Sequence, residues 1–506
     1  MGFKGREVFP GGANILAQSE VKKAGRPWAL LLLLVTQFFG TSARGDQSSP
    51  QVIAGELRSG NFQRALTDCD SLLKRRPGDP MLLTLRGLAL RGLGRWKESL
   101  TSFDRAIRDS PNLLPALEAA AETAYVNKDA RAARYLNQLL SKHPENETAN
   151  AMAGALAYEH HQCKAAIRHF ERSVGVLVQN EVGVSQFSAC LLEANRSAGA
   201  LSILARATKI APGNINLQYN LAVAQLRNGL PKDAMATLES LSSGSEPNAQ
   251  VMNLLATAQM ATGDLEGSVN SLRKAIQMAP MVESNYLDLA ILSLEHDNPT
   301  PAVEVTNAAL SNVPNPSYRL YSVRGMAQAE LSHYDDAEAD FAKSLELHPQ
   351  NPGAIAGKSV YYTRTDQPAK AAILLRDKLR TAPKDPVLNY LLADALVRAG
   401  AEPSTPEFME AQLALQRSLH VKPDAVEALG LAGKLYIKAN DLERASDVLK
   451  RAVNKDPGNR AAMNQLLLVL RKLGRREEAA KVAERLTALV NRERENSDKL
   501  RVDANR

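Results

Sequence analysis

Residues 322–349 read SVRGMAQAELSHYDDAEADFAKSLELHP, and four positions in this stretch decide the fold. Gly325 is followed twelve residues later by Ala337, then four residues later by Phe341 and eight residues later by Pro349. Ala or Gly is needed where two helices approach closely, and a large apolar residue fills the space beside them. Proline ends the second helix because it lacks the N–H group that a continuing helix would use. The stretch therefore predicts two helices joined by a turn.

The same spacing recurs along almost the whole chain. Eleven prolines follow apolar helical stretches, most of them 33 to 35 residues apart: Pro77, Pro111, Pro144, Pro212, Pro247, Pro280, Pro314, Pro349, Pro383, Pro423 and Pro457. One proline is missing between Pro144 and Pro212, near Val178, and the interval that ends at Pro423 is six residues longer than the period. A small residue precedes most of these prolines by twelve positions, as Ala132 precedes Pro144. The pattern indicates an array of helix pairs instead of several compact domains.

The repeat resembles the tetratricopeptide repeat family, whose unit is a 34-residue helix–turn–helix with this small–apolar–proline spacing. The resemblance covers residues 46–490 and is clearest in the stretch quoted above and in ALGLAGKLYIKANDLERASDVLKRAVNKDP at 428–457. It implies an all-α fold, a right-handed superhelical solenoid of about thirteen helix–turn–helix units over residues 44–490. Residues 401–406 read as a lengthened surface loop inside the eleventh unit, without an apolar anchor, and residues 491–506 as a charged cap or tail.

Composition excludes several other classes of protein. The 506 residues are 44% hydrophobic and 23% charged, which is too apolar for a disordered chain, and only 5% are aromatic. Three Cys residues cannot build a disulfide-dense scaffold, and the sequence has no Cys-x-x-Cys pair to hold zinc. The net charge of +7 is a slight excess over a long chain, and the sequence has no basic stripe with interleaved aromatics. We therefore expect no nucleic-acid partner.

The first 43 residues have the organisation of an export signal. Basic residues outnumber acidic ones before an apolar run from Trp28 to Phe39. Twelve helical residues reach about 18 Å, which is too short for a hydrocarbon core of ~30 Å. Small residues at Thr41 and Ala43 suit a signal peptidase, so we predict that residues 1–43 are a signal peptide and that the protein is exported, either periplasmic or secreted. A membrane anchor at residues 28–39 and a leader without function remain alternatives.

The sequence contains no motif of an enzyme. It has no Gly-rich phosphate loop, no His-Glu-x-x-His pair and no Gly-x-Ser-x-Gly elbow, and the repeat leaves no room for a separate catalytic domain. We therefore expect no catalytic residue and no cofactor.

Several residues of metal-binding type lie at the inter-helix turn of the fourth unit. His160, His161 and Cys163 are close together there, beside Glu159, and His169 follows. Such side chains are ligands of transition metals. A solvated turn explains the same residues, because adjacent His side chains diverge on a helix, and we predict no metal site.

The resemblance also bears on the cysteines. It places Cys163 on the second helix of one unit and Cys190 on the first helix of the next, on faces that pack together in this fold. In an exported chain these two residues form either a disulfide or two free thiols, and the sequence leaves both open. Cys69 occupies a position that holds Phe or Leu in other units, so we expect it in the core.

In the family, positions 2, 5, 9 and 12 of each first helix line a concave groove. Carried onto this sequence, these positions hold few charges, namely Arg91, Arg319, Asp394, Glu427, Lys434 and Arg471. The partner-binding groove that we predict contains Leu88, Leu192, Tyr219, Leu226, Met260, Leu287, Leu294, Met326 and Tyr390, and Leu117 belongs to the same set. The Lys and Asn clamp with which some members hold a C-terminal carboxylate is absent. Such a groove suits an apolar segment of a protein partner, unless its residues contact only one another.

These expectations favour a non-catalytic protein–protein interaction scaffold of the cell envelope, most simply in a bacterial periplasm. Its protein partners are not identified by the sequence. An alternative is a component of exopolysaccharide synthesis or export, because exported solenoids of this family accompany such machinery. A third is a subunit of a glycosyltransferase, since some large transferases carry these repeats.

Overall fold

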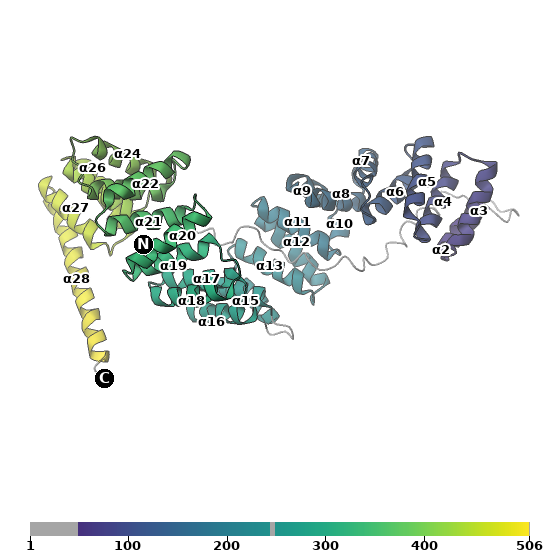
Figure 1. The fold of residues 1–506 in the computed structure, drawn as a ribbon. Coiled ribbons are helices and arrows are strands. Elements are labelled where there is room, and N and C mark those ends of the chain that lie inside the picture. Colours follow the sequence, from purple (N-terminus) through teal and green to yellow (C-terminus); the bar gives the residue numbers. More distant parts are fainter. Residues whose placement is uncertain (1–48, 243–247, 505–506) are drawn as a thin grey trace. The chain divides into compact units, whose positions relative to one another are not determined.

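The computed structural model describes residues 49–242 and 248–504, with side chains as far as residue 491. The predicted signal peptide, residues 1–43, lies outside the described residues. Within them the chain forms 27 helices and no strand, so the all-α prediction is confirmed (Figure 1). In this part of the chain, no helix combines the length and the apolar character that a membrane span requires.

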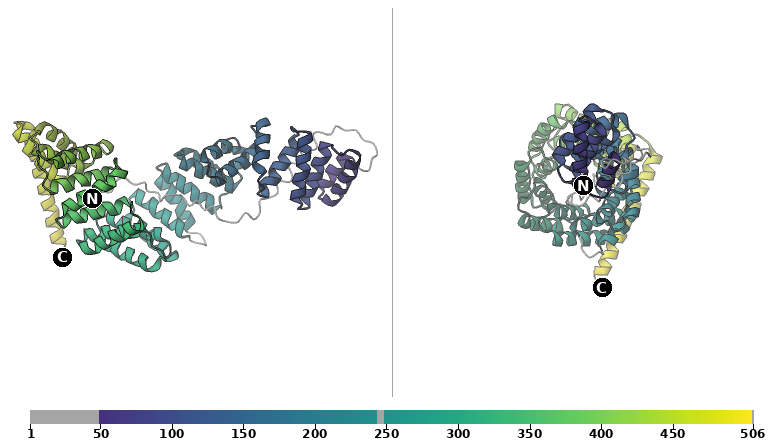
Figure 2. Two further views of the ribbon diagram at one scale, coloured as in Figure 1. Left: turned by 45° about the horizontal axis from the view of Figure 1, so that its top comes forward. Right: turned by 90° about the vertical axis from the view of Figure 1, so that its right-hand side faces the viewer.

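The helices form thirteen consecutive pairs, which confirms the predicted number of repeats. The first helices are α2 (Pro50–Arg58), α4 (Pro80–Gly92), α6 (Leu114–Val126), α8 (Glu147–Glu159), α11 (Glu181–Glu193), α13 (Ile215–Arg227), α15 (Ala249–Thr262), α17 (Glu283–Glu295), α19 (Tyr318–Glu330), α21 (Pro352–Arg364), α23 (Pro386–Arg398), α25 (Val426–Lys438) and α27 (Arg460–Lys472). The second helices are α3 (Phe62–Arg75), α5 (Trp96–Asp109), α7 (Ala132–Lys142), α9 (Cys163–Glu171), α12 (Ser197–Ile210), α14 (Pro231–Ser242), α16 (Leu265–Met278), α18 (Pro299–Asn312), α20 (Tyr334–Leu347), α22 (Pro368–Thr381), α24 (Pro406–Val421), α26 (Leu442–Lys455) and α28 (Arg476–Ala504). A short extra helix, α10 (Val174–Leu177), follows α9. In most pairs the first helix packs against its own second helix and against the first helix of the next pair (Figure 2).

The chain divides into two compact units between Ser271 and Leu272, inside α16. The described residues up to Ser271 are called the N-terminal unit below, and those from Leu272 onward the C-terminal unit. The sequence did not predict this division, because the repeat pattern runs through it without a change of period.

Within a pair, a glycine lets the two helices approach closely. In the pair α19–α20, a Cβ atom built on Gly325 would lie 2.8 Å from Cε1 of Phe341, so a larger residue leaves no room for the ring. Phe341 and Ala337 are fully buried there. In the pair α8–α9, Gly154 lies against Phe170 in the same way, at 2.7 Å. The roles predicted for the small and large residues are confirmed in these pairs, and we call each Gly–Phe contact a glycine lock.

The residue two positions after a periodic proline starts the next first helix. Asn351 follows Pro349, and its Oδ1 accepts the backbone N–H two positions later at 3.1 Å. Asp385 follows Pro383 and accepts in the same way at 2.9 Å. Side-chain caps of this kind also begin α4, α8, α13 and α27. A Pro-x-Asn or Pro-x-Asp triplet therefore ends one helix and caps the next.

The turn inside every pair contains one residue with positive φ. These residues are Gly60, Gly94, Lys128, His161, Asn195, Gly229, Gly263, Asp297, Ser332, Asp366, Gly400, Asn440 and Gly474. Glycine takes this conformation without strain, and Asn and Asp tolerate it better than most residues. One left-handed residue is thus common to all thirteen turns, although their sequences and lengths differ.

Two regions depart from the regular repeat. In the fourth pair, where the proline is missing, α9 ends at Glu171 after nine residues and α10 follows it. In the eleventh pair, the loop at residues 401–406 is exposed at its tip, but Ala401 is buried and its carbonyl oxygen accepts a hydrogen bond from Lys438 Nζ at 2.8 Å. Lys438 also pairs with Glu402 at 2.7 Å. The loop therefore has an anchor on α25 that the sequence did not predict.

The chain's last helix also differs from the expectation. The charged tail predicted to start at residue 491 has no boundary there, because α28 continues from Arg476 to Ala504.

Candidate functional site

The residues predicted to form a groove all lie on first helices. Leu88 is on α4, Leu192 on α11, Tyr219 and Leu226 on α13, Met260 on α15, Leu287 and Leu294 on α17, Met326 on α19, and Tyr390 on α23. Eight of the nine are partly exposed, whereas Leu287 is only 4% exposed and offers little surface. Leu117 is fully buried, because it is the fourth residue of α6, a position that is also in the core as Leu83 in α4 and Leu429 in α25. The eight partly exposed residues, which leave out Leu287 and Leu117, are called the first-helix face below.

The first-helix face is continuous with the core. Leu88 packs against the buried clusters of two successive pairs, and Tyr219 and Leu226 pack against the cluster that contains Val223 and Leu255. These side chains therefore contact the core on one side and leave the other side exposed to solvent.

The tyrosines of this face are not suited to proton transfer. Burial raises the pKa of Tyr390 to about 12, and the nearby carboxylates of Asp394 and Glu427 act in the same direction, against an opposing effect of Arg398. Burial also raises the pKa of Tyr219. Both hydroxyl groups keep their protons at physiological pH, so they are able to donate hydrogen bonds and do not act as bases.

A largely buried ion pair lies at the same register in the N-terminal unit. Arg91 Nη1 of α4 lies 2.8 Å from Glu122 Oε2 of α6, and the two side chains are 13% and 9% exposed. Glu118, one turn before Glu122, accepts a hydrogen bond from Asn146 Nδ2 at 2.8 Å, and burial raises the pKa of Glu118. Sequence reasoning found Arg91 but missed both glutamates. Arg91 and Glu122 are 31 residues apart, which is close to one repeat, and this separation was the signal that could have identified the pair.

The last turns of the first helices carry opposite charges in two stretches. In the N-terminal unit, α8 and α11 end in the exposed Glu159 and Glu193. In the C-terminal unit, basic residues occupy the last turns of four successive first helices, namely Arg364, Arg398, Lys438, and Arg471 with Lys472. Arg398 is paired with Asp394 at 2.7 Å, whereas Arg364 and Arg471 are exposed. The two stretches would favour partner segments of opposite charge.

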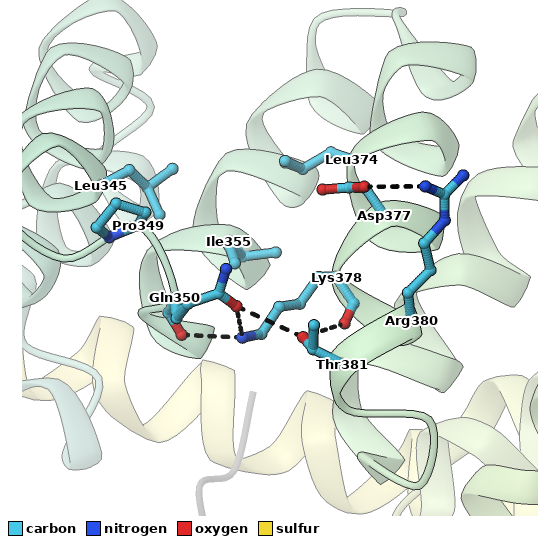
Figure 3. Close-up of a pocket in the computed structure, with 9 residues that line it drawn as sticks. All are labelled: Leu345, Pro349, Gln350, Ile355, Leu374, Asp377, Lys378, Arg380 and Thr381. Carbon is cyan, nitrogen blue, oxygen red and sulfur yellow. Dashed lines mark hydrogen bonds and ion pairs between the residues drawn. The ribbon is translucent and has the colours of Figure 1, made fainter.

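The cavities do not suggest a substrate pocket. A cleft of about 240 Å³ between α20, α21 and α22 is lined by Leu345, Pro349, Gln350, Ile355, Leu374, Asp377, Lys378, Arg380 and Thr381 (Figure 3). Its polar groups satisfy one another: Lys378 Nζ donates to the Gln350 carbonyl oxygen at 3.2 Å, and Thr381 Oγ1 donates to the Lys378 carbonyl oxygen at 3.0 Å. A second depression, of about 660 Å³, is lined by residues from Gly60 to Asp68 and by Leu93. Neither site brings together a nucleophile and a base.

The residues that resembled metal ligands have other roles. His161 is the positive-φ residue of its turn. His169 Nδ1 lies 2.9 Å from Asn150 Oδ1, and Cys163 is bonded to Cys190. Among the described residues, no three His, Cys, Asp or Glu side chains are grouped to hold a metal ion.

Cys69 lies where the sequence placed it. It is fully buried in the cluster formed by α2, α3 and α4, and burial raises the pKa of its thiol to about 12. The thiol is thus an inert core group.

Sequence and structure comparisons identify relatives of the same architecture. Tetratricopeptide repeat family models match residues 55–113, 191–258, 249–280 and 407–468. The chain is 30% identical over 126 residues to interferon-induced protein with tetratricopeptide repeats 2 of Homo sapiens, and 28% identical over 122 residues to the protein of that name of Mus musculus. Each match covers 24% of this chain, and the chain spans about a quarter of these relatives, 26% and 25% of their lengths.

A solved structure, the anaphase-promoting complex hetero-tetramer Cut9-Hcn1, is also similar. It aligns with 84% of this chain and 90% of its own at 14% identity, with a TM-score of 0.42. The thirteen helix pairs, the glycine locks and the matched segments together identify tetratricopeptide repeats in this chain.

Proposed function

We propose that this protein is a non-catalytic protein–protein interaction scaffold that is exported to the cell envelope and binds partner segments along its first-helix face. Tetratricopeptide repeat proteins generally bind protein partners and are generally non-catalytic. The observation that carries the proposal is the repetition of partly exposed apolar residues on successive first helices. Eight predicted groove residues keep exposed surface on seven different first helices, four in the N-terminal unit and three in the C-terminal unit, so each unit offers a binding surface that extends over several repeats.

The polar groups on this surface support binding and not catalysis. Tyr390, with a pKa of about 12, keeps its proton, and the Arg91–Glu122 pair is closed on itself at 2.8 Å. Tyr390 is therefore not a general base near neutral pH, and the Glu122 carboxylate is engaged by Arg91. Recognition therefore rests on apolar contact, with the charges of the last turns selecting between partners.

The predicted signal peptide supports the location, and export remains part of the proposal. No feature of the described residues favours a role in exopolysaccharide synthesis over a general scaffold, so that alternative adds nothing to the proposal.

A binding experiment with matched variants tests this function. The exported chain is cross-linked to partners in envelope extract, and the bound proteins are identified by mass spectrometry. The binding variant carries Leu294→Gln and Met326→Gln on two neighbouring first helices. The control carries Ile373→Ser on the second helix α22, where Ile373 is 65% exposed. Circular dichroism and thermal melting establish that both variants fold.

We expect wild type and the Ile373→Ser control to recover the same partner, and the double variant to lose it at an unchanged melting temperature. Recovery of no partner by wild type would contradict the proposal. So would a partner that the double variant retains and the control loses.

A further inference from the structure

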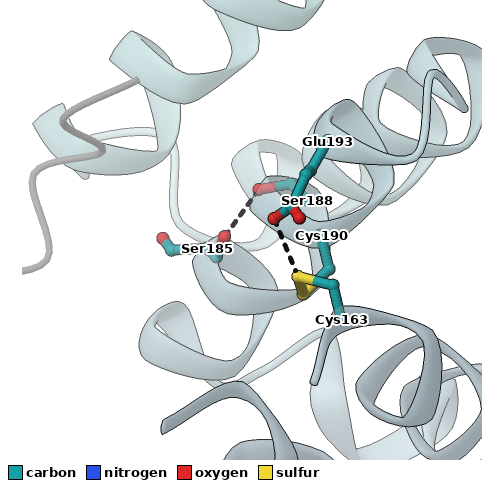
Figure 4. The surroundings of a disulfide bond; sticks show 5 residues. All are labelled: Cys163, Ser185, Ser188, Cys190 and Glu193. Atoms are coloured by element: carbon teal, nitrogen blue, oxygen red, sulfur yellow. Dashed lines mark hydrogen bonds between the residues drawn. A yellow bond between two sulfur atoms is a disulfide. The ribbon is translucent and has the colours of Figure 1, made fainter. Parts of the chain in front are cut away.

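A covalent bond fastens the junction between the fourth and fifth pairs. Cys163 is the first residue of α9, and Cys190 lies in the last turn of α11 (Figure 4). The structure joins them in a disulfide, with Cα atoms 5.1 Å apart and a sequence separation of 27 residues. The bond therefore connects the second helix of one pair to the first helix of the next.

This junction is the least regular in the N-terminal unit. The fourth pair lacks its proline, and α9 is nine residues long where α5 and α12 are 14. After α9, the chain is held to its own pair, because Glu147 Oε2 of α8 accepts the N–H of Val176 at 2.9 Å. The shortened α9 has less length to offer to α11. A covalent link at its first residue compensates for the contact that the missing turns would make.

The two sulfur atoms differ in their access to solvent. Cys190 is fully buried in a cluster with Phe187, Leu191 and Ala166, whereas Cys163 is partly exposed. A reducing thiolate can therefore reach only the Cys163 sulfur, and it must expel the sulfur of Cys190 as a thiolate.

The surroundings disfavour both parts of that reaction. Glu193 Oε2 lies 3.2 Å from Cys163 Sγ, so its negative charge repels an incoming thiolate (Figure 4). The dashed contact is a hydrogen bond only when Cys163 is a thiol, because a disulfide sulfur carries no hydrogen. The departing Cys190 thiolate would be buried among apolar groups, and the nearby Ser188 hydroxyl already donates to the Ser185 carbonyl oxygen at 2.9 Å. A thiolate formed there has no solvent and no free hydroxyl to stabilise it.

We propose that Cys163 and Cys190 are an oxidation site whose disulfide is a permanent structural staple, formed during folding and protected from reduction by Glu193 and by the burial of Cys190. On closure each thiol gives up its proton, and the S–S bond forms between the two sulfurs. The two electrons pass to a disulfide of a protein or small-molecule oxidant, whose own S–S bond breaks to give two thiols. The chain must meet such an oxidant as it folds, which requires an oxidising compartment. The inference goes beyond partner binding and does not depend on which partner is bound.

A thiol count is the first test of the staple. The full-length chain, expressed with its leader and recovered from the envelope, is denatured and alkylated with and without prior reduction. We expect one alkylated cysteine, Cys69, without reductant and three with it. Three alkylated cysteines without reductant would overturn the proposal, even if the partner assay above succeeds.

The rate of reduction tests the protection. We expect glutathione to reduce the folded protein at least about tenfold more slowly than the urea-unfolded protein. Glu193→Gln should speed reduction of the folded protein by about two- to fivefold, because one nearby charge is removed. Glu159→Gln, at the end of the preceding first helix, is the matched control and should change nothing. An uncharged phosphine should reduce wild type and Glu193→Gln equally fast.

Two results would contradict the protection. One is reduction of the folded protein as fast as of the unfolded protein, and the other is equal rates for wild type and Glu193→Gln with glutathione. If Glu193→Gln alters the fold, its circular dichroism will show it, and the comparison of folded and unfolded wild type still decides the matter.

Discussion

The fourth pair (α8–α9) and the ninth pair (α19–α20) share one internal contact and differ in how they are joined to a neighbour. Gly154 lies against Phe170 in the fourth, and Gly325 against Phe341 in the ninth. The ninth pair is joined to the eighth by Arg324 of α19, which donates a hydrogen bond to Asn307 of α18 at 2.8 Å. Arg324 also forms a bidentate ion pair with Asp340 of α20. The fourth pair is joined to the fifth by a disulfide instead.

The difference teaches that the contact inside a pair, the glycine lock, is independent of the link that joins one pair to the next. The glycine lock forms where the small residue is Gly and the large residue is Phe, as in these two pairs. The link depends on the length of the second helix and on individual side chains. A repeat can therefore lose its proline and part of its second helix and still pair, provided another link replaces the lost contact.

The largest effect should come from removing either ring of the glycine lock. Phe170→Ala and Phe341→Ala each empty a fully buried site, so each should lower the free energy of local unfolding by about 3–5 kcal/mol. Hydrogen–deuterium exchange of peptides from α8–α9 and α19–α20 measures the loss at each site. A loss below about 1 kcal/mol in the fourth pair would mean that the disulfide, and not the lock, holds that pair together.

Removing the disulfide should have the next largest effect, and this effect should be confined to the fourth and fifth pairs. A loop of this length closed by a disulfide is worth about 3 kcal/mol, so Cys163→Ser with Cys190→Ser should speed exchange in α9 and α11 by about a hundredfold. Exchange in α19–α20 is the internal control and should not change. An equal change in both pairs would contradict a local link.

Adding one methyl group to each lock should cost less. Gly154→Ala and Gly325→Ala place a Cβ at 2.7 and 2.8 Å from a ring carbon, and relieving that contact should cost about 1–3 kcal/mol. Gly430→Ala in α25 is the control, because nothing lies within 4 Å of the added Cβ, and it should gain about 0.5–1 kcal/mol. Urea unfolding measures all three. Destabilisation by Gly430→Ala as large as at the locks would contradict the close-contact explanation.

The smallest predicted effect is a pH dependence in the fourth pair alone. The pKa of His169 is lowered, first by burial and then by Arg168 and Arg172, so the folded protein binds this proton less well than the unfolded chain. The stabilisation is complete above the unfolded pKa of about 6.5 and is lost as pH falls through that value towards the folded pKa. Since His169 is partly exposed, the loss should stay below about 1 kcal/mol.

His169→Gln is the matched variant, because Gln can still donate to Asn150 Oδ1. Urea midpoints at pH 7.5 and 5.5 should differ more for wild type than for His169→Gln. The same difference in both proteins would exclude His169 as the cause.

The sequence predicted the helix pairs because their determinants are local and periodic. The spacing from Gly325 to Pro349 places two helices and a stop without any long-range information. The sequence did not predict the caps at Asn351 and Asp385, although each follows its proline by two residues, because apolar spacing carries no information about polar caps. The break after Glu171 had a visible signal, the missing proline, but the formation of α10 depends on Glu147, 29 residues before Val176.

The candidate site was less predictable, because exposure depends on where each helix begins. Leu117 is the fourth residue of α6 and not the fifth, and this one-position difference places it in the core instead of the expected groove. The ion pair of Arg91 and Glu122 needed two helices in register, and the disulfide needed the register of α9 against α11. The choice between bonded and free cysteines cannot be made from spacing alone, because it also depends on the compartment.

The most direct test of the account is the intact mass of the protein recovered from its own cells, denatured and alkylated without reduction. If the array is exported and closed at one junction by a disulfide, the expected mass is that of a chain beginning at Arg44 with one alkylated cysteine. A mass that includes residues 1–43 together with three alkylated cysteines would contradict both export and the staple.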